Sequence, residues 1–385
     1  MAIWSNLAGT VTGYLRLGLS GVRIKDAAGV LAVRNAGDTA DAGVTGAPSA
    51  TETVAGLSRR STTAEAQAGT EDSAHMTALK VRKTVGAFAP QVINIRNYQS
   101  LADAAGGSWT SAFNQALVDA VASGCRTIYF PYNVSDNNGN YNFNTKPNVI
   151  GNGITLLGEN PRQFLVRNYA PSGAAGTADS SFLVWDGSGY ANSDPNQNKG
   201  GGIVNLGVGA GNGTSTGAAI LITGADTNNR PGYMMFDNVV VSVPLGSTGT
   251  WSFGVLIKGQ NIITAGSQGM RDITFVALYI FRCTGDPMQI TNGVHIFANG
   301  LVVSDGGAGN AAPAVRVNGT GTAESNSIQV MLSNLDIEGT LAFDQCSRVV
   351  ATGYVNEINT TTTATACKFM GALNINNATT GTTVL

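Results

Sequence analysis

Two carboxylates toward the C-terminus have a spacing that acid–base chemistry can use. Asp336 and Glu338 alternate with Leu335 and Ile337, so on a β-strand both carboxylates would leave the same outward face. Their Cα atoms would then lie roughly 6.5–7 Å apart. Hydrolysis of a glycosidic bond uses one carboxyl group as an acid and a second, about 5–9.5 Å away, as a base or nucleophile. Two solvated carboxylates on a polar face would show the same pattern, so both interpretations stay open.

Other residues are candidates for the same chemistry or for binding. Asp305 follows the preceding strand of the repeat described below and could lie near the carboxylate pair. Trp185, Asp186 and Tyr190 stand at the edge of a segment rich in Gly and Asn, residues 187–200. Aromatic rings offer flat apolar faces on which sugar rings can stack, so we predict a glycan contact here. The alternative is a loop that is anchored in the protein by its aromatic residue.

Several kinds of site are absent from the sequence. The chain has 2 histidines, and its 4 cysteines form no C-x-x-C pair, so we expect no metal, no cofactor and no disulfide framework. We expect the cysteines to be buried thiols of a protein that folds in a reducing compartment: Cys125, Cys283, Cys346 and Cys367. A formal net charge of −2 gives no electrostatic reason to bind nucleic acid. No long apolar run exists, so we expect no membrane insertion, and residues 1–19 lack the pattern of a signal peptide.

The elements that would position these residues form a repeat. Short apolar strands that close with glycine recur at residues 219–224, 254–259, 288–293 and 314–319. Between them run second strands, residues 236–241, 297–303 and 332–338, which contain Asn238, Asn299 and Asn334. Two strands per repeat unit are typical of a parallel β-solenoid, in which each coil stacks on the last. We expect the three asparagines to stack as an amide ladder at a corner of the coil.

An amphipathic helix is predicted at the entry to the solenoid. Residues 92–95 read as a short strand, and apolar residues then recur every four positions: Trp109, Phe113, Leu117 and Val121. Such a stripe is one face of a helix, and Gly124 can end it. The first coil of a solenoid exposes an apolar end and an unpaired strand edge, so a helix is expected to cover it.

The composition divides the chain into three expected regions. Residues 1–48 contain alternating apolar and polar positions that predict a hairpin over residues 22–33. Residues 49–86 have helix formers and charges of both signs, and residues 87–385 hold the solenoid. Charged residues make up 12% of the chain, about half of the usual ~25%. With so few charges, packing of several copies would hide the apolar part of the surface.

The second region resembles a module of bacteriophage tail fibre and tail spike proteins. The matching segments are residues 50–58 (ATETVAGLS), 63–72 (TAEAQAGTED) and 76–80 (MTALK), with Ala78 in place of the proline usual in the module. Residues 24–38 are similar to segments of phage virion proteins.

From residue 92 onward the chain resembles the pectin-lyase-like family of right-handed parallel β-helices. The resemblance includes the order of strand and Ala-rich helix, followed by residues 127–131 (TIYFP) and 153–158 (GITLLG). The family usually carries an acidic box before the helix, and residues 105–112 (AGGSWTSA) contain no acidic residue at that place. The expected fold is therefore mainly β, a right-handed parallel β-helix with a capping α-helix and a small N-terminal virion-anchoring region.

Together the resemblances imply a homotrimeric phage tail spike or tail fibre, made in the host cytoplasm and carried on the virion. Residues 1–86 would dock to a phage tail or adaptor protein, and the β-helix would bind bacterial surface polysaccharide during host attachment. The alternative is a polysaccharide depolymerase, an endoglycosidase on the same β-helix with Asp336 and Glu338 as its pair. The missing acidic box favours the non-enzymatic interpretation. A bacterial surface adhesin is a third class, which the absence of a signal peptide disfavours.

Overall fold

The structure is a computed structural model. It describes residues 14–16, 23–27, 30–34, 92–134, 136, 139–151, 153–186, 200–224, 232–244, 246–259, 270–304, 313–319, 327–360, 364, 367–370 and 382–384. The chain divides into two compact units, Met1–Ala89 and Pro90–Leu385. The region that resembles the tail fibre module, residues 49–86, lies outside the described residues.

The described part of the first unit is a small antiparallel sheet of β1 (Tyr14–Arg16), β2 (Arg23–Ala27) and β3 (Val30–Arg34). β2 and β3 pair with Ile24 opposite Val33 and Ala27 opposite Val30. The hairpin predicted over residues 22–33 is therefore confirmed, and β1 adds a third strand to it.

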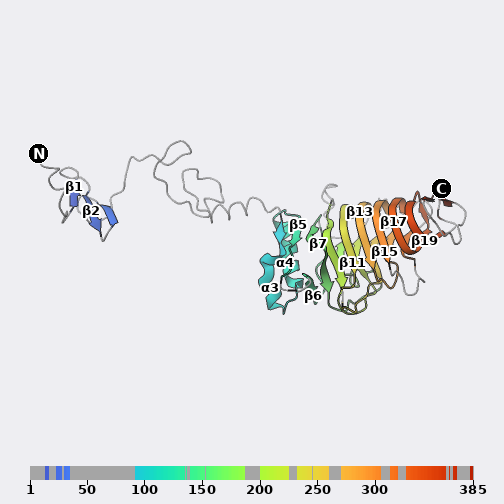
Figure 1. Cartoon of the computed structure of the whole chain (residues 1–385), viewed down its shortest axis with the longest axis horizontal. Coiled ribbons are helices and arrows are strands. Elements are labelled where there is room, and N and C mark those ends of the chain that lie inside the picture. The colour runs from blue at the N-terminus through green and yellow to red at the C-terminus, as the bar shows by residue number, and fades with distance from the viewer. Residues whose placement is uncertain are drawn as a thin grey trace, which may run out of the picture. The chain divides into compact units, whose positions relative to one another are not determined.

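The second unit is the expected parallel β-helix. In its described residues, 18 strands form one sheet that winds through successive coils, and the strands pair in parallel with the strand one coil away. The strands that enter and begin the coil are β4 (Ile93–Asn94), β5 (Thr127–Phe130), β6 (Tyr141–Phe143), β7 (Thr155–Arg167), β8 (Leu183–Asp186), β9 (Gly202–Ala210) and β10 (Ala218–Thr223). The later ones are β11 (Gly232–Ser242), β12 (Phe253–Lys258), β13 (Met270–Phe281), β14 (Met288–Thr291), β15 (Gly293–Ser304), β16 (Val315–Asn318), β17 (Ser327–Asp344), β18 (Cys346–Ser347), β19 (Val350–Thr360), β20 (Cys367–Met370) and β21 (Thr382–Val384). In Figure 1 the coils follow one another along the axis from green to red.

Each coil has three faces, as the strand pairing shows. Face A contains β8, β10, β12, β14, β16 and residues 341–344 of β17. Face B contains the N-terminal parts of β9, β11, β13, β15 and β17, and face C contains their C-terminal parts. The short glycine-closed strands of the sequence repeat are therefore the strands of face A, stacked in register.

The corner between faces B and C is a column of residues with left-handed backbone. The column is Asn205, Asn238, Ala277, Gly300 and Asn334, with φ between 50° and 73°. Asparagine tolerates this conformation better than most residues, and its amide can bond along the stack. Asn238 Nδ2 donates to Asn205 Oδ1 at 2.5 Å, and Asn334 Nδ2 donates to Asn299 Oδ1 at 2.7 Å. The predicted ladder of Asn238, Asn299 and Asn334 is therefore confirmed only in part: Asn299, one residue before the corner that Gly300 occupies, bonds Asn334, whereas Asn238 bonds Asn205 and is separated from the other two by Ala277.

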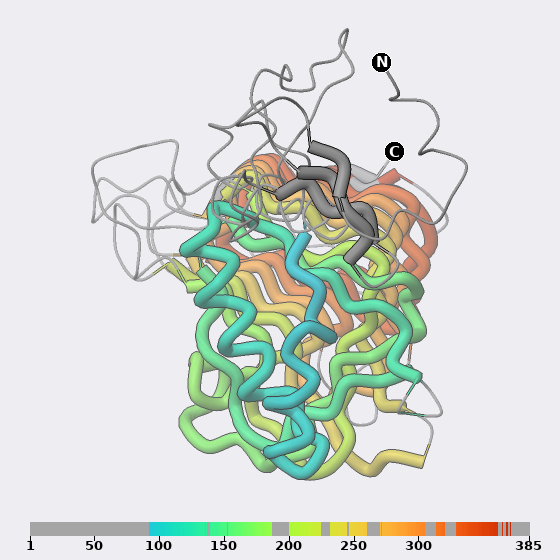
Figure 2. The backbone as a smooth tube through the Cα atoms, turned by 90° about the vertical axis from the view of Figure 1, so that its left-hand side faces the viewer, coloured from blue at the N-terminus to red at the C-terminus, as the bar shows by residue number. Residues whose placement is uncertain are grey.

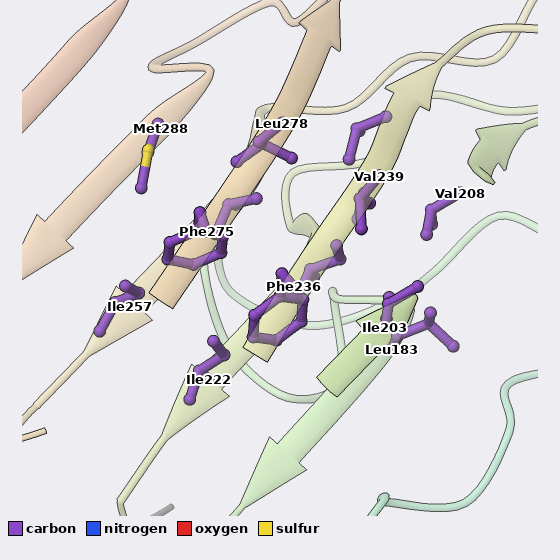
Figure 3. Close-up of a cluster of buried hydrophobic side chains, with 14 of the residues drawn as sticks. Leu183, Ile203, Val208, Ile222, Phe236, Val239, Ile257, Phe275, Leu278 and Met288 are labelled. Atoms are coloured by element: carbon purple, nitrogen blue, oxygen red, sulfur yellow. The ribbon is translucent and has the colours of Figure 1, made fainter. Parts of the chain in front are cut away.

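The interior of the coil is apolar and stacked. Phe236 and Phe275 lie on neighbouring strands with ring centroids 4.9 Å apart and an angle of 19° between the rings. Figure 3 shows these two rings one above the other, with Ile222 and Ile257 of face A beside them. Both rings are fully buried, so each coil buries its neighbour and contributes to one continuous core.

A helical segment covers the N-terminal end of the coils, as predicted. It consists of η1 (Ile95–Tyr98), α3 (Gln99–Ala104) and α4 (Thr110–Ala122), which lie in front of the coils in Figure 2. Phe113 of α4 packs on Phe130 and Phe143. The predicted stripe is wrong at one position, because Val121 is 44% exposed. Small side chains complete the buried face instead: Ala112, Ala116 and Ala120.

Face A is covered on its outer side as well. Val184, Ala218, Leu221 and Leu256 form a second apolar cluster, against which Ala178 and Phe253 pack. Ala178 belongs to the insertion at residues 169–181, which therefore folds back over face A.

Candidate functional site

The outer side of face C carries a row of residues that are neighbours in the strand register. From β7 to β19 the row is Phe164, Gly207, Val240, Tyr279, Val302, Asp336 and Tyr354. Successive strands lie about 4.8 Å apart, so this row runs along the axis of the β-helix. It brings aromatic and acidic residues from distant parts of the sequence onto one surface.

Two aromatic residues of β13 form the centre of this surface. Leu278 and Ile280 are buried, so the residues that alternate with them, Tyr279 and Phe281, point outward. Both are partly exposed. β13 thus presents two rings in successive outward positions, next to Val302 and Ser304 on β15.

A hollow of about 810 Å³ lies beside these rings. Its lining consists of Asn140, Pro161, Arg162, Phe164, Asn238, Val240, Ser242, Val243, Pro244, Tyr279 and Phe281. Two glycines of β9 allow its shape. A Cβ atom on Gly207 would lie 2.5 Å from the Phe164 ring, and one on Gly209 would lie 2.8 Å from Pro244. The absent side chains let Phe164 and Pro244 pack directly on the sheet.

Polar groups stand at defined places in the hollow. Asn140 Oδ1 accepts from the backbone N–H of Phe164 at 3.0 Å, which fixes its amide. Asn238 belongs to the amide pair at the corner of the coil. Ser242 contributes a hydroxyl group, and Arg162 is exposed and contributes a positive charge. Flat apolar rings with a few oriented polar groups are the usual lining of a small-molecule or oligomer binding site.

This arrangement suits a ligand with flat apolar faces and many hydroxyl groups. The rings of Phe164, Tyr279 and Phe281 can contact the C–H faces of sugar rings, while amide, hydroxyl and guanidinium groups can bond the hydroxyls. The hollow opens on a face whose residues repeat along the axis, so a chain of sugars could continue past it.

The predicted carboxylates lie on the same face. Leu335 and Ile337 are buried, whereas Asp336 and Glu338 are exposed, which confirms that both carboxylates leave the outer side of one strand. Asp336 is two strands beyond Tyr279 in the register, a distance of about 10 Å. Glu338 Oε2 accepts from Ser304 Oγ at 2.5 Å. Neither carboxylate lines the hollow itself.

The predicted aromatic contact at β8 is corrected by the structure. Trp185 is fully buried, its Nε1 donates to the Ile154 carbonyl at 3.3 Å, and its ring packs edge-on against Phe236. It points into the coil because β8 lies within face A, where the inward positions form the core. Asp186 is half-buried at the end of this strand. Tyr190 and Asp305 lie outside the described residues.

Tyr279, Phe281 and Phe164 were missed by the sequence analysis. A signal for them exists: in β13 the aromatic residues Tyr279 and Phe281 alternate with the aliphatic residues Leu278 and Ile280. This alternation can be interpreted only with knowledge of the corner at Ala277. The corner exchanges the inward and outward positions of the residues that follow it.

Within the part of the chain that the structure describes, no group of three or more His, Cys, Asp or Glu side chains could hold a metal ion. His295 Nδ1 lies 3.1 Å from Asp272 Oδ1. None of the described helices is both long enough and apolar enough to cross a membrane.

Comparisons with known proteins give a limited result. No protein-family model matches the sequence, and no curated protein matches it either. Similar solved structures include tailspike protein 3 of bacteriophage CBA120, which is 11% identical over 78% of this chain and 62% of its own, with a TM-score of 0.24. ORF18 of Geobacillus virus E2 is 12% identical over 92% of this chain and 69% of its own, with a TM-score of 0.26.

The catalytic unit of a GH87 alpha-1,3-glucanase from Streptomyces thermodiastaticus strain HF3-3 is 14% identical over 76% of this chain and 67% of its own, with a TM-score of 0.26. A phage tailspike and a polysaccharide-acting enzyme are thus among the structures similar to this chain. The chain spans 62% of the tailspike, less than two thirds of its length. At these identities and TM-scores the similarities assign no activity, substrate or partner to this chain.

Proposed function

We propose that this protein is a tail spike or tail fibre component of a phage virion, and that its β-helix binds bacterial surface polysaccharide during host attachment. Polysaccharide binding is supported by the hollow on face C. Its lining combines three aromatic rings with an amide and a guanidinium group: Phe164, Tyr279, Phe281, Asn140 and Arg162. The proposal that the protein is a component of a phage virion rests on the resemblance of residues 49–86 to the phage tail fibre module. In this proposal residues 1–86 dock to the tail or to an adaptor protein.

The proposal includes a homotrimer, for which face B offers a surface. An outward row on this face is Met235, Thr274, Phe297, Met331 and Val350. Met235 is 46% exposed, Phe297 40% and Met331 46%, so an apolar stripe, interrupted by Thr274, runs along the axis. A surface with this periodicity fits a second copy of the same chain, coil against coil.

Substitution of Tyr279 by alanine tests the binding site. Because aromatic residues at the centre of an interface typically cost about 2 kcal/mol or more when truncated, we expect affinity for the polysaccharide of a susceptible host to fall about 30-fold or more. The measurement is binding of the purified protein to immobilised capsule or lipopolysaccharide. Tyr233→Ala is the matched control, since Tyr233 is 55% exposed on another part of the coil. Equal affinity of both variants and the original protein would reject the face C site.

A second candidate function is depolymerisation of the same polysaccharide. The observation that favours it is the position of Asp336 and Glu338 on face C, in continuation of the row that contains Tyr279. A glycan held on the rings could extend across both carboxylates, which would act as acid and as base or nucleophile.

Release of reducing ends over time separates the two functions. If the protein is an endoglycosidase with this pair, Asp336→Asn and Glu338→Gln should each lower the rate by a factor of 100 or more, on the order of the contribution of one acid–base group, without loss of binding. Ser304→Ala is a useful comparison variant. It removes the hydroxyl group that donates to Glu338 and keeps both carboxylates in place. Binding without any release of oligosaccharide would reject the enzymatic candidate.

A further inference from the structure

A fully buried arginine joins three turns of the coil. Arg167, at the end of β7, is 0% exposed. Its Nη1 donates to the carbonyl of Tyr169 at 2.6 Å, and its Nη2 donates to the carbonyls of Gly213 at 2.8 Å and Thr250 at 3.1 Å. The guanidinium carbon lies 4.5 Å from the centre of the Trp251 ring and 6.0 Å from that of Tyr169. These four residues, Arg167, Tyr169, Thr250 and Trp251, are here called the Arg167 cluster.

Each member of the cluster has a buried polar atom without a hydrogen-bond partner. These atoms are Arg167 Nε, Tyr169 Oη, Thr250 Oγ1 and Trp251 Nε1. Among the described side chains the other such atom is Gln163 Oε1, which is an acceptor. Buried polar groups in native proteins are nearly always bonded, so a cluster of unbonded ones indicates a bound water or ion. All four atoms of the cluster can donate, and the two nitrogens can only donate.

The charge of the cluster is not balanced by its known partners. Within the described residues, the contacts of the Arg167 guanidinium are carbonyl oxygens and aromatic rings, not a carboxylate. Burial lowers the pKa of Arg167 to about 10, so the group remains protonated at neutral pH. A buried charge is strongly unfavourable unless an opposite charge accompanies it.

We propose that the Arg167 cluster binds a small monoatomic anion of the size of chloride inside the β-helix. Arg167 Nε and Trp251 Nε1 would donate to the anion, and the hydroxyls of Thr250 and Tyr169 would turn to donate as well. A water molecule could accept from the two nitrogens and donate to the hydroxyl oxygens of Thr250 and Tyr169, but it would leave the buried charge of Arg167 without an opposite charge. The anion supplies the missing negative charge and ties together the same three turns that the arginine joins.

Bromide is the direct probe, because it replaces chloride and scatters X-rays anomalously. Crystals of the full chain grown in sodium bromide should show an anomalous peak within hydrogen-bond distance of Arg167 Nε and Trp251 Nε1. A peak with the density of water and no anomalous signal at this place would overturn the proposal. This measurement needs no variant, so it does not depend on whether a substitution in the cluster still folds.

Thermal unfolding gives an independent measurement. In sodium chloride against sodium gluconate at equal ionic strength, Tm should rise by about 3 °C for each tenfold increase in chloride once the site fills. Thr250→Val removes one donor with little change in shape, and Trp251→Phe removes another but also replaces the indole by a smaller ring. Both substitutions should weaken this dependence on chloride. Thr214→Val is the control, since Thr214 is exposed and pairs with Thr250 one coil away. Identical Tm values in the two salts would contradict the proposal.

Discussion

Replacing Gly202 by valine is expected to prevent formation of the coils around β9. Gly202 has a φ of 131°, and a Cβ atom there would lie 1.8 Å from the carbonyl oxygen of Met235. That oxygen belongs to the neighbouring strand β11, which pairs with β9 at this point. The side chain would therefore have to push apart two paired strands, in addition to strain of about 1–3 kcal/mol from the backbone conformation. We expect a loss of about 5 kcal/mol or more, which is comparable to the total stability of many domains.

Gly200→Ala is the matched control for this prediction. Gly200 also has a positive φ, 92°, but a Cβ atom there would meet nothing within 4 Å. Only the conformational cost remains, about 1–2 kcal/mol. The measurement is soluble yield, far-ultraviolet circular dichroism and the midpoint of guanidinium unfolding for both variants. If the two substitutions had equal effects, the close approach of β9 and β11 at Gly202 would not be the cause.

Placing aspartate at two positions of the face B stripe is expected to convert the proposed trimer into monomers. Phe297 and Met331 are neighbours on β15 and β17, and their side chains are 40% and 46% exposed in the single chain. Full burial of an exposed side chain of this size contributes about 1.5–3 kcal/mol, so burial of the part that is still exposed contributes roughly 1 kcal/mol. Each substitution acts three times in a trimer. A carboxylate without a partner in an apolar interface adds a further penalty. The double variant Phe297→Asp with Met331→Asp should sediment with roughly a third of the mass of the original protein.

The control for this prediction is Val118→Asp on α4. Val118 is 56% exposed and belongs to the capping helix, not to the strands that carry the face B stripe, so its replacement should leave the mass unchanged. Circular dichroism identifies a variant that fails to fold. A folded double variant with the mass of the original protein would show that face B is not the subunit interface. An original protein that sediments as a monomer would reject the homotrimer itself.

The repeating coil of the β-helix could be predicted from the local sequence. The strands of face A are short apolar segments that close with glycine at residues 224, 259, 293 and 319, and this pattern needs no knowledge of distant contacts. The capping helix was readable for the same reason, because Phe113 and Leu117 recur at helical spacing. Its small buried residues, such as Ala116, gave no signal, since alanine occurs equally on exposed helix faces.

The orientation of Asp336 and Glu338 could be predicted from the local sequence, whereas that of Trp185 could not. Asp336 and Glu338 follow the corner at Asn334 directly, and Leu335 and Ile337 mark the inner side without ambiguity. Trp185 also belongs to a short strand, but both Val184 and Trp185 are buried. The insertion at residues 169–181 covers the outer side of face A, so the strand shows no alternation of apolar and polar residues. Local sequence alone could not decide which way Trp185 points.

The sequence by itself determined the parallel β-helix, its capping helix, and the outward position of the carboxylate pair, because these depend on periodicities within a few residues. The tertiary structure alone decided the hollow on face C. Along a straight strand Phe275, Tyr279 and Phe281 would share one side. The left-handed residue at Ala277 reverses the phase, so that Phe275 packs in the core while Tyr279 and Phe281 face outward. Only the stacking of coils then brings Phe164 and Pro244 beside them.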